Sequence, residues 1–255
     1  MISDSDIQLA NRLADTAGAA IRPYFRARFE IETKGDATPV TVADREAEAA
    51  MRALISRERP AEGIIGEEYG PEREGASRLW VLDPIDGTRS FISGRPIFGT
   101  LIALVEDGVP VLGLIDQPII GERWVGALGR PTTFNAAPCR TRVCPELKLA
   151  QLATTSPYLF SESEWPAFER LAASSGNQVF GGDCYSYATL ASGHLDLVVE
   201  SGLKLYDFAA LVPVIEGAGG RMTDWQGRSL GSSSDGRVIA AGDPRLIDQA
   251  LALIG

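Results

Sequence analysis

The sequence predicts a layered α/β or α+β fold. Short apolar runs typical of strands alternate with longer segments in which apolar residues recur at helical spacing. Hairpin signals join some neighbouring strands, as at residues 106–108. Such alternation is typical of sheets covered by helices. The 255 residues can form one large domain or two lobes, and they suffice to bury a substantial core.

Two helices are predicted at the start of the chain. Apolar residues recur at helical spacing over residues 5–29, where Pro23 is expected to kink or shorten the helix. A second helix is predicted over residues 43–55. Thr41 and Asp44 resemble a capping box at its start. Local sequence therefore favours Asp44 as a helix cap. The alternative is that Asp44 supports a catalytic residue.

Strands dominate the next part of the chain. They are predicted over residues 63–66, 79–82, 98–106, 109–115 and 123–126, with a polar loop over 70–77 and a short helix or turn over 88–94. Acidic residues follow the first two strands: Glu67 follows one, and Asp83 and Asp86 follow the other. Taken alone, Glu67 is most simply explained as part of a solvated loop. The two strand ends would nevertheless meet at one edge of a sheet, which favours a shared site.

The second half of the chain repeats the mixed pattern. Gly and Pro are dense over residues 129–145, so we place an N-terminal lobe at 1–135 and a C-terminal lobe at 136–255 of one two-lobed unit. The predicted strands are 152–155, 178–181, 195–199 and 238–241, and the predicted helices are 164–173, 185–192, 207–218 and a last one that begins at 243–244.

Composition narrows the class of function. The net charge of −10 argues against nucleic acid as a partner. No secretory signal and no membrane-spanning apolar run are recognisable, so no membrane partner is expected. The three cysteines lack the spacing of a metal finger, which favours reduced thiols in a cytoplasmic protein. His194, the one histidine, is expected in an exposed turn, and Arg95 and Lys204 on the solvated surface.

The segment from Asp83 to Thr88 combines two carboxylates with the start of a helix. Pro84 lies between Asp83 and Asp86, so the chain is expected to leave extended geometry and let both acids converge. Converging carboxylates suit a hard divalent cation such as Mg2+. The free N–H groups of Gly87 and Thr88 at the helix start suit a phosphate. One turn therefore predicts a site for both metal and phosphate.

Three segments together resemble the signatures of the inositol monophosphatase-like superfamily. They are Gly66-Glu67-Glu68, residues 83–88 and Tyr206-Asp207-Phe208-Ala209-Ala210, and residues 38–44 match a fourth, weaker signature. The ordered set covers nearly the whole chain and is far more specific than one acidic motif. The resemblance implies an α/β/α/β/α sugar-phosphatase fold and Mg2+-dependent hydrolysis of a small phosphate monoester.

The resemblance also implies two or three Mg2+ ions in the active site. Glu67, Asp83 and the carbonyl group of Ile85 would bind the first, and Asp83, Asp86 and Asp207 would bind the second. Such a metal pair activates water and stabilises the attacking and leaving oxygens of an in-line displacement.

Four residues are implied in catalysis and phosphate binding. Glu67 and Thr88 would orient the attacking water, and Asp44 would accept a hydrogen bond from Thr88. The N–H groups of Gly87 and Thr88 would bind the phosphate. A homodimer and inhibition by Li+ are further implications of the resemblance.

Substrate choice is expected to depend on Asp183 and Glu200. The segment 181–187 is similar to the bacterial histidinol-phosphate phosphatase branch, and Glu200 lies where inositol phosphatases contact the alcohol. Histidinol phosphate carries an ammonium group, which two acids would favour. An N-cap role explains Asp183 equally well on local grounds. The rival functions are hydrolysis of inositol 1-phosphate, or of another polyol or nucleotide phosphate, and a non-catalytic ligand-binding or regulatory role, which the complete acid set disfavours.

Overall fold

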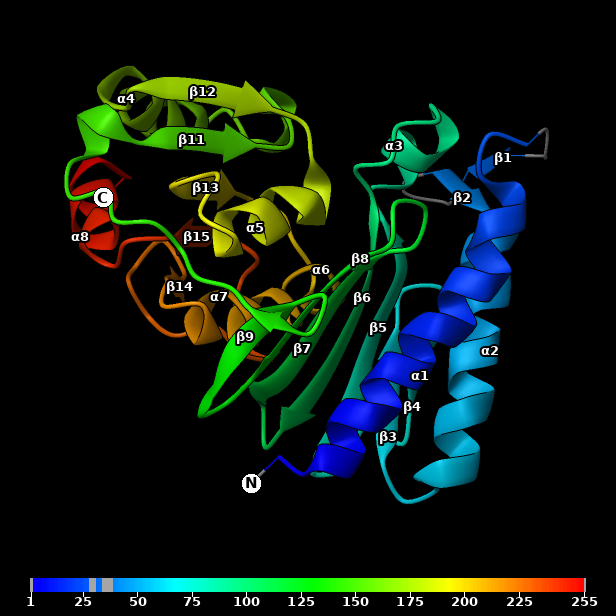
Figure 1. Cartoon of the computed structure of the whole chain (residues 1–255). Helices are drawn as coiled ribbons and strands as arrows, with labels where there is room; N and C mark the ends of the chain where they lie inside the picture. Colours follow the sequence, from blue (N-terminus) through cyan, green and yellow to red (C-terminus); the bar gives the residue numbers. More distant parts are fainter. Residues whose placement is uncertain (1, 28–30, 34–38, 255) are drawn as a thin grey trace.

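Layers of helices and sheets alternate through the molecule (Figure 1). The computed structural model describes residues 2–27, 31–33 and 39–254. From one side to the other the layers are α1 (Asp4–Ile21) with α2 (Val42–Glu58), an eight-stranded sheet, α5 (Asp183–Ala191) with α6 (Leu205–Phe208) and α7 (Leu211–Gly217), a five-stranded sheet, and α4 (Trp165–Ser174) with α8 (Arg245–Ile254). This order confirms the predicted α/β/α/β/α architecture.

The eight-stranded sheet is antiparallel except at one pair. Its order is β10 (Ala137–Pro138), β9 (Arg130–Phe134), β8 (Glu122–Ala127), β7 (Val109–Gln117), β6 (Gly99–Glu106), β5 (Arg78–Asp86), β3 (Gly63–Gly66) and β4 (Gly70–Glu72), and only β3 and β5 run parallel. The predicted strands of this half are confirmed. The polar loop expected over 70–77 is wrong at its start, because β4 pairs with β3 at the edge of the sheet. The edge strands β4 and β10 lack the apolar runs that reveal buried strands.

Side chains of the central strands alternate between two cores, as strand geometry requires. Trp80 and Leu82 of β5 face the core beneath α1 and α2, whereas Val81 faces the core shared with α5 and α7. Because the strand is buried on both faces, its sequence is continuously apolar. This explains why the run before Asp83 stands out in the sequence.

The first two helices differ in length from the prediction. α1 ends at Ile21 and continues as a 3-10 turn, η1 (Arg22–Tyr24), which contains Pro23, so proline shortens the helix as expected. The end of the predicted range, at residues 28–29, lies outside the described residues. The capping box at the start of α2 is confirmed, because the Thr41 N–H donates to Asp44 Oδ2 at 2.9 Å. A short antiparallel pair, β1 (Ile31–Thr33) and β2 (Pro39–Thr41), precedes α2.

α7 packs unusually close to the eight-stranded sheet. A Cβ atom on Gly113 of β7 would lie 1.9 Å from the Ala210 carbonyl oxygen, and one on Gly126 of β8 would lie 2.2 Å from the Pro213 carbonyl oxygen. Only glycine permits this approach. The single helix predicted over 207–218 is two helices, α6 and α7, and Pro213 lies in the first turn of α7, where its missing N–H costs nothing.

The second sheet has the order β12 (Asn177–Phe180), β11 (Gln151–Thr154), β13 (Leu197–Glu200), β15 (Val238–Ala241) and β14 (Arg221–Thr223). β12, β11 and β13 run parallel, and β15 and β14 are antiparallel to their neighbours. The chain passes between the sheets from Pro138 to Gln151, through η2 (Leu147–Leu149). The lobe boundary at 135/136 stays a prediction. Among the described residues, no helix has the length and apolar character needed to cross a membrane.

Candidate active site

Parallel pairing of β3 and β5 places Glu67 beside Asp83. Gly66 is the partner of Leu82 in the register, and the Glu67 N–H donates to the Leu82 carbonyl at 3.1 Å. The residues that follow these partners, Glu67 and Asp83, therefore lie at the same end of the two strands. Asp83 is 1% exposed, and burial raises its pKa well above the usual value, with Glu67 and then Asp86 and Asp207 adding to the shift.

A bulge in β5 brings Asp86 toward the same point. Asp83 pairs with Leu101 and Asp86 with Gly99, so one extra residue is accommodated between them. The Asp83 Oδ1 atom accepts the Ile85 N–H at 3.0 Å, which fixes the carboxylate within the bulge. The chain was expected to leave extended geometry after residue 82. Instead β5 continues to Asp86, because pairing with β6 resumes beyond the bulge.

Three carboxylates converge where β5 meets α6. Oxygen atoms of Asp83, Asp86 and Asp207 lie within 4.8 Å of one another. Two backbone groups orient them: the Lys204 N–H donates to Asp207 Oδ2 at 2.6 Å, and the Cys184 N–H donates to Asp86 Oδ2 at 2.5 Å. Burial raises the pKa of Asp207 to about 7 and the pKa of Asp86 well above its usual value.

These acids fit a bound cation. Among the described residues, no lysine or arginine forms an ion pair with Asp83, Asp86 or Asp207, although like charges this close repel one another. Carboxylate oxygens at this spacing are the ligands that hard divalent cations prefer. The donor set therefore fits a divalent metal ion and leaves a charge for it to balance.

The start of α3 (Thr88–Ile92) lies directly after these acids. Gly87 has φ of 87°, a left-handed conformation, and a Cβ atom there would lie 2.6 Å from Asp183 Oδ2. Glycine is required on both grounds. The Thr88 hydroxyl donates to the Ile85 carbonyl at 3.1 Å.

The predicted hydrogen bond from Thr88 to Asp44 is not formed. A hydroxyl has one proton, and that of Thr88 goes to Ile85 in the same turn. Asp44 Oδ2 accepts the N–H and hydroxyl of Thr41, whereas its buried Oδ1 has no hydrogen-bond partner among the described residues. Burial raises the pKa of Asp44 to about 6. One oxygen of Asp44 thus caps α2, and the other is a buried acceptor without a donor among the described residues.

Asp183 enters the site at the start of α5, and Glu200 enters it at the end of β13. Gly182, with φ of 112°, is the N-cap of α5, so the N-cap interpretation of Asp183 is wrong. Asp183 itself has φ of 43° and accepts the Ser90 hydroxyl at 2.8 Å. Glu200 is 3% exposed, and both of its oxygens are occupied, by the Thr155 N–H at 2.8 Å and the Tyr187 hydroxyl at 2.9 Å.

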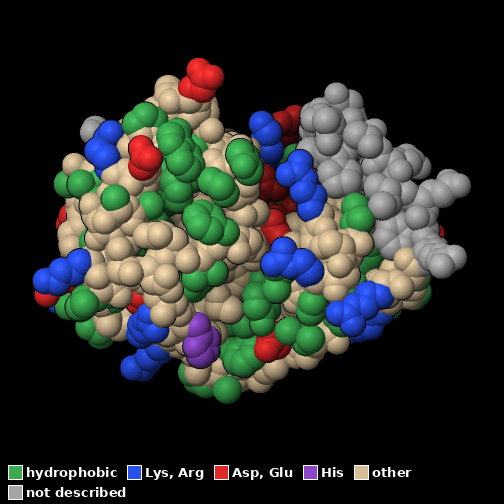
Figure 2. Space-filling model, turned by 90° about the horizontal axis from the view of Figure 1, so that it is seen from above, with side chains coloured by type: hydrophobic (Ala, Val, Ile, Leu, Met, Phe, Trp, Pro, Cys, Tyr) green, Lys and Arg blue, Asp and Glu red, His purple; other side chains and the backbone are tan. Residues whose placement is uncertain are grey.

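One cavity of about 210 Å³ joins the two groups of acids. Its polar lining includes Asp86, Asp183, Glu200 and Asp207, and its apolar lining includes Leu159 at the end of η3 (Pro157–Leu159). Figure 2 shows acidic side chains inside a hollow between the two halves of the molecule, with lysine or arginine side chains beside its opening. The structure thus brings metal-type and substrate-type residues together, as the sequence predicted.

Comparison with known proteins identifies the family of this chain. A sequence model described as the inositol monophosphatase family matches residues 3–254. The chain belongs to the inositol monophosphatase family. It is a phosphatase of that family, whose members depend on metal ions and act on small phosphorylated substrates.

The relatives of this family member carry different names. The bifunctional phosphatase IMPL2, chloroplastic, of Arabidopsis thaliana is 51% identical over 98% of this chain and 76% of its own. The histidinol-phosphatase of Chlorobaculum parvum is 36% identical over 98% of this chain and 96% of its own. A solved structure of an inositol monophosphatase from Zymomonas mobilis has 58% identity and a TM-score of 0.92, with 98% of each chain covered.

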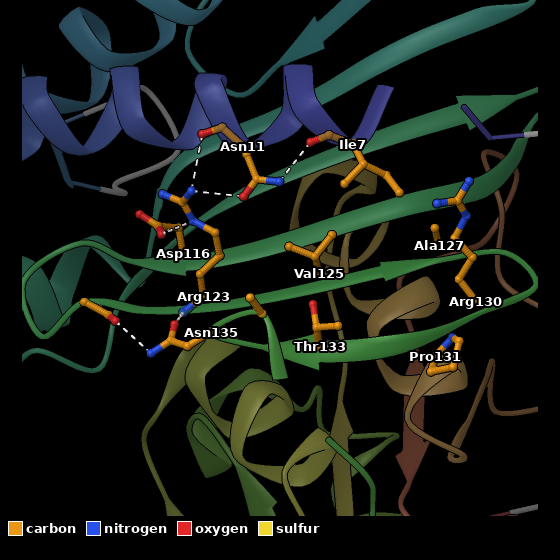
Figure 3. Close-up of a pocket in the computed structure, with 12 residues that line it drawn as sticks. Ile7, Asn11, Asp116, Arg123, Val125, Ala127, Arg130, Pro131, Thr133 and Asn135 are labelled. Atoms are coloured by element: carbon orange, nitrogen blue, oxygen red, sulfur yellow. Dashed lines mark hydrogen bonds and ion pairs between the residues drawn. The ribbon is translucent and has the colours of Figure 1, made fainter. Parts of the chain in front are cut away.

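A larger cavity of this phosphatase lies away from the acids. It measures about 590 Å³ and lies against β8, β9 and α1 (Figure 3). Its central cation, Arg123, is already paired with Asp116 at 2.7 Å and Asp15 at 2.8 Å, and it also donates to Asn11 at 3.1 Å. With its charge balanced internally, this cavity lacks the chemistry of the acidic one.

Other sequence predictions concern single residues. His194, Arg95 and Lys204 are exposed, as expected. Sequence reasoning missed Tyr187 and Ser90, which bind Glu200 and Asp183. Both lie in or near predicted helices, and a polar residue on the buried face of a helix was the available signal.

Proposed function

We propose that this phosphatase hydrolyses L-histidinol phosphate to L-histidinol and phosphate with the help of Mg2+. The observation that carries the proposal is Asp183, a carboxylate that lines the same cavity as Asp86 and Asp207. A substrate with an ammonium group near its phosphate ester would place the ammonium group beside Asp183 and the phosphate beside the metal ions held by Asp86 and Asp207. The histidinol-phosphatase name of a 36% identical relative supports this choice.

Seven residues of this chain have proposed roles in binding metal and phosphate. We assign Glu67, Asp83 and the Ile85 carbonyl to one Mg2+ and Asp83, Asp86 and Asp207 to another, with two or three ions in all. When bound, Mg2+ supplies a nucleophile at neutral pH and stabilises charge on the phosphoryl oxygens. The N–H groups of Gly87 and Thr88 bind the phosphate, because they lie at the start of α3, where backbone donors are free.

Glu67 and Thr88 orient the attacking water in this proposal. Glu67 enters beside Asp83 from β3, and the Thr88 hydroxyl accepts hydrogen bonds while its proton is held by Ile85. Asp44 belongs to the same network, since its buried Oδ1 is an acceptor without a partner among the described residues. The chemistry is direct in-line attack on phosphorus, with no covalent phosphoenzyme.

Asp183 and Glu200 contribute unequally to substrate binding. Glu200 has both oxygens engaged by Thr155 and Tyr187, whereas Asp183 accepts the Ser90 hydroxyl with one oxygen and has no donor among the described residues for the other. We therefore assign the ammonium group chiefly to Asp183. Glu200 adds negative potential to the wall of the cavity.

Inositol 1-phosphate is the second candidate substrate, because a solved inositol monophosphatase shares 58% identity with this chain. Phosphate release from both esters, measured side by side with Mg2+ and with a chelator, tests the proposal. We expect a clear preference in kcat/KM for histidinol phosphate and no turnover with the chelator. A preference for inositol 1-phosphate would overturn the substrate assignment.

A cytoplasmic homodimer inhibited by Li+, without nucleic-acid or membrane partners, completes the proposal. The three cysteines are free, in keeping with a reducing compartment. Light scattering of the purified protein checks the dimer, and a Li+ titration of the phosphatase activity checks the inhibition.

A further inference from the structure

Glu48 is a completely buried acid that the proposed mechanism does not use. It lies in the middle of α2 with 0% exposure. A charge removed from water in this way is costly unless it is paired and its oxygens accept hydrogen bonds. The partners of Glu48 therefore show what it holds in place.

The carboxylate of Glu48 binds the turn that carries Glu67. Its Oε2 atom accepts the Glu68 N–H at 2.7 Å, and its Oε1 atom accepts the Tyr69 N–H at 3.2 Å. These are the first two backbone donors after Glu67. Arg52, one helical turn further along α2, donates to Oε1 at 2.7 Å and neutralises the charge.

Arg52 binds a backbone carbonyl of the same turn. Its Nη2 atom donates to the Gly70 carbonyl, and its guanidinium carbon lies 5.9 Å from the centre of the Tyr69 ring. Glu48 thus binds two backbone N–H groups of the segment 68–70, and Arg52 binds one of its backbone carbonyls. We call these two side chains the α2 clamp.

Gly66 makes room for the α2 clamp. A Cβ atom on Gly66 would lie 1.9 Å from Glu48 Oε1 and 2.8 Å from Arg52 Nη2. Any other residue at position 66 would displace the carboxylate from the turn. The glycine before Glu67 is thereby explained by contact with α2, since its own φ is not in the left-handed region.

We propose that Glu48 is a positioning residue for Glu67. The backbone of Glu67 is fixed from two sides: its own N–H binds the Leu82 carbonyl at 3.1 Å, and the next N–H binds Glu48. With both peptides held, the Glu67 side chain is directed to Asp83 before any metal binds. The inference rests on the proposed function in one respect, the assignment of Glu67 as a metal ligand.

Glu48→Gln tests the role, because it keeps the shape of the side chain and removes the charge and one acceptor. In the metal-free variant we expect amide hydrogen exchange at residues 68–69 to be at least about 10-fold faster, with the rest of α2 protected as before. Calorimetric titration should show Mg2+ affinity lowered about 10-fold, the lower end of the effect of residues that support metal ligands. Gly66→Ala, which displaces the same carboxylate, should do likewise.

Asp196→Asn is the matched control. Asp196 is also buried, and it accepts hydrogen bonds from Arg142 and from the Gln151 N–H. It lies directly before β13 in the second sheet, however, and not at the acidic site. This variant should bind Mg2+ as the wild type does. Unchanged exchange at 68–69 in Glu48→Gln, or Mg2+ affinity within about 2-fold of the wild type, would overturn the positioning role.

Glu67→Gln separates failure of this role from failure of the proposed function. If Glu67→Gln binds Mg2+ as tightly as the wild type, the metal assignment is wrong and the positioning role falls with it. If Glu67→Gln weakens binding and Glu48→Gln does not, the positioning role alone is wrong.

Discussion

Buried acids in two regions of this molecule have opposite electrostatic surroundings. In the second sheet, burial alone would raise the pKa of Asp196, but hydrogen bonds from Arg142 and the Gln151 N–H lower it. Arg245 lowers the pKa of Asp243 to about 2. In the cleft that contains the acidic cavity, burial raises the pKa of Asp207 to about 7. No arginine or lysine among the described residues is paired with Asp207.

The difference teaches what the cleft requires. Asp196 and Asp243 obtain their positive charge from this chain, so their role is structural. The cleft acids Asp83, Asp86 and Asp207 are held together by backbone geometry, the β3–β5 register and the β5 bulge, and no described residue forms an ion pair with them. A divalent metal ion would supply the positive charge that these acids lack among the described residues.

Asp83→Asn should produce the largest effect on activity. Asp83 contributes to both proposed metal sites, and metal ions supply several kcal/mol of transition-state stabilisation, so kcat/KM should fall at least about 10³-fold. Thermal stability without Mg2+ should not fall, because the substitution removes repulsion. Phosphate release and thermal melts of the metal-free protein check both points. An active variant, or one strongly destabilised, would show that Asp83 resembles Asp196 in role.

The pH dependence of stability should separate the two regions. Asp207 and Asp44 have pKa values of about 7 and about 6 in the fold, against an ordinary 3.8. Raised carboxyl pKa values stabilise the fold below pH 3.8, and this contribution is lost as the pH rises toward 7. Arginine-paired acids have lowered pKa values, so they stabilise the fold at higher pH. This contribution is lost as the pH falls below about 4.

The raised pKa of Asp207 alone should therefore cost the metal-free protein about 3 kcal/mol of stability between pH 4 and pH 7, and Asp44 should add to this loss. Mg2+ at pH 7 should restore most of it, since binding to the folded state adds stability. Denaturant unfolding at several pH values, with and without Mg2+, measures this. Stability that increases over the same window in the metal-free protein would contradict the assignment of the cleft acids.

Asp196→Asn should show the converse of Asp83→Asn. Loss of the buried carboxylate leaves Arg142 and the Gln151 N–H with poorer partners, at a cost of about 2 kcal/mol. The turnover of the folded variant should match the wild type. Urea unfolding together with a steady-state assay tests this, and a specific loss of kcat would place Asp196 in the functional set.

Asp183→Asn should have the smallest effect, confined to substrate choice. Loss of one charge-assisted hydrogen bond should raise KM for histidinol phosphate about 10-fold, and the KM for inositol 1-phosphate should change much less. Glu200→Gln is the comparison, and its smaller effect is expected because Thr155 and Tyr187 already occupy its oxygens. Equal changes for both substrates would remove Asp183 from the ammonium site.

Sequence reasoning succeeded where neighbouring residues act together. The apolar strand before Asp83, the glycine at Gly87 and the Thr41–Asp44 cap each follow from local chemistry, and family resemblance joined Asp207 to them. The β5 bulge and the edge strands were missed, because pairing with a distant strand decides them. The α2 clamp was also missed, since the turn bound by Glu48 lies 20 residues away in sequence.

The Thr88 hydrogen bond shows a second limit. The resemblance predicts a hydrogen bond from Thr88 to Asp44, but the Thr88 hydroxyl donates to the Ile85 carbonyl instead. Sequence alone does not rank competing acceptors. Nor does it reveal that Glu200, which the resemblance places at a substrate position, has both oxygens occupied.

Calorimetric titration of the metal-free protein with Mg2+ tests the central claim most directly. The claim is that the cleft acids, unlike Asp196, are organised to receive a cation from solution. We predict that the wild type and Asp196→Asn bind Mg2+ with equal affinity and that Asp83→Asn binds at least about 100-fold more weakly. Equal affinity of Asp83→Asn and the wild type, or no binding to the wild type, would contradict the claim.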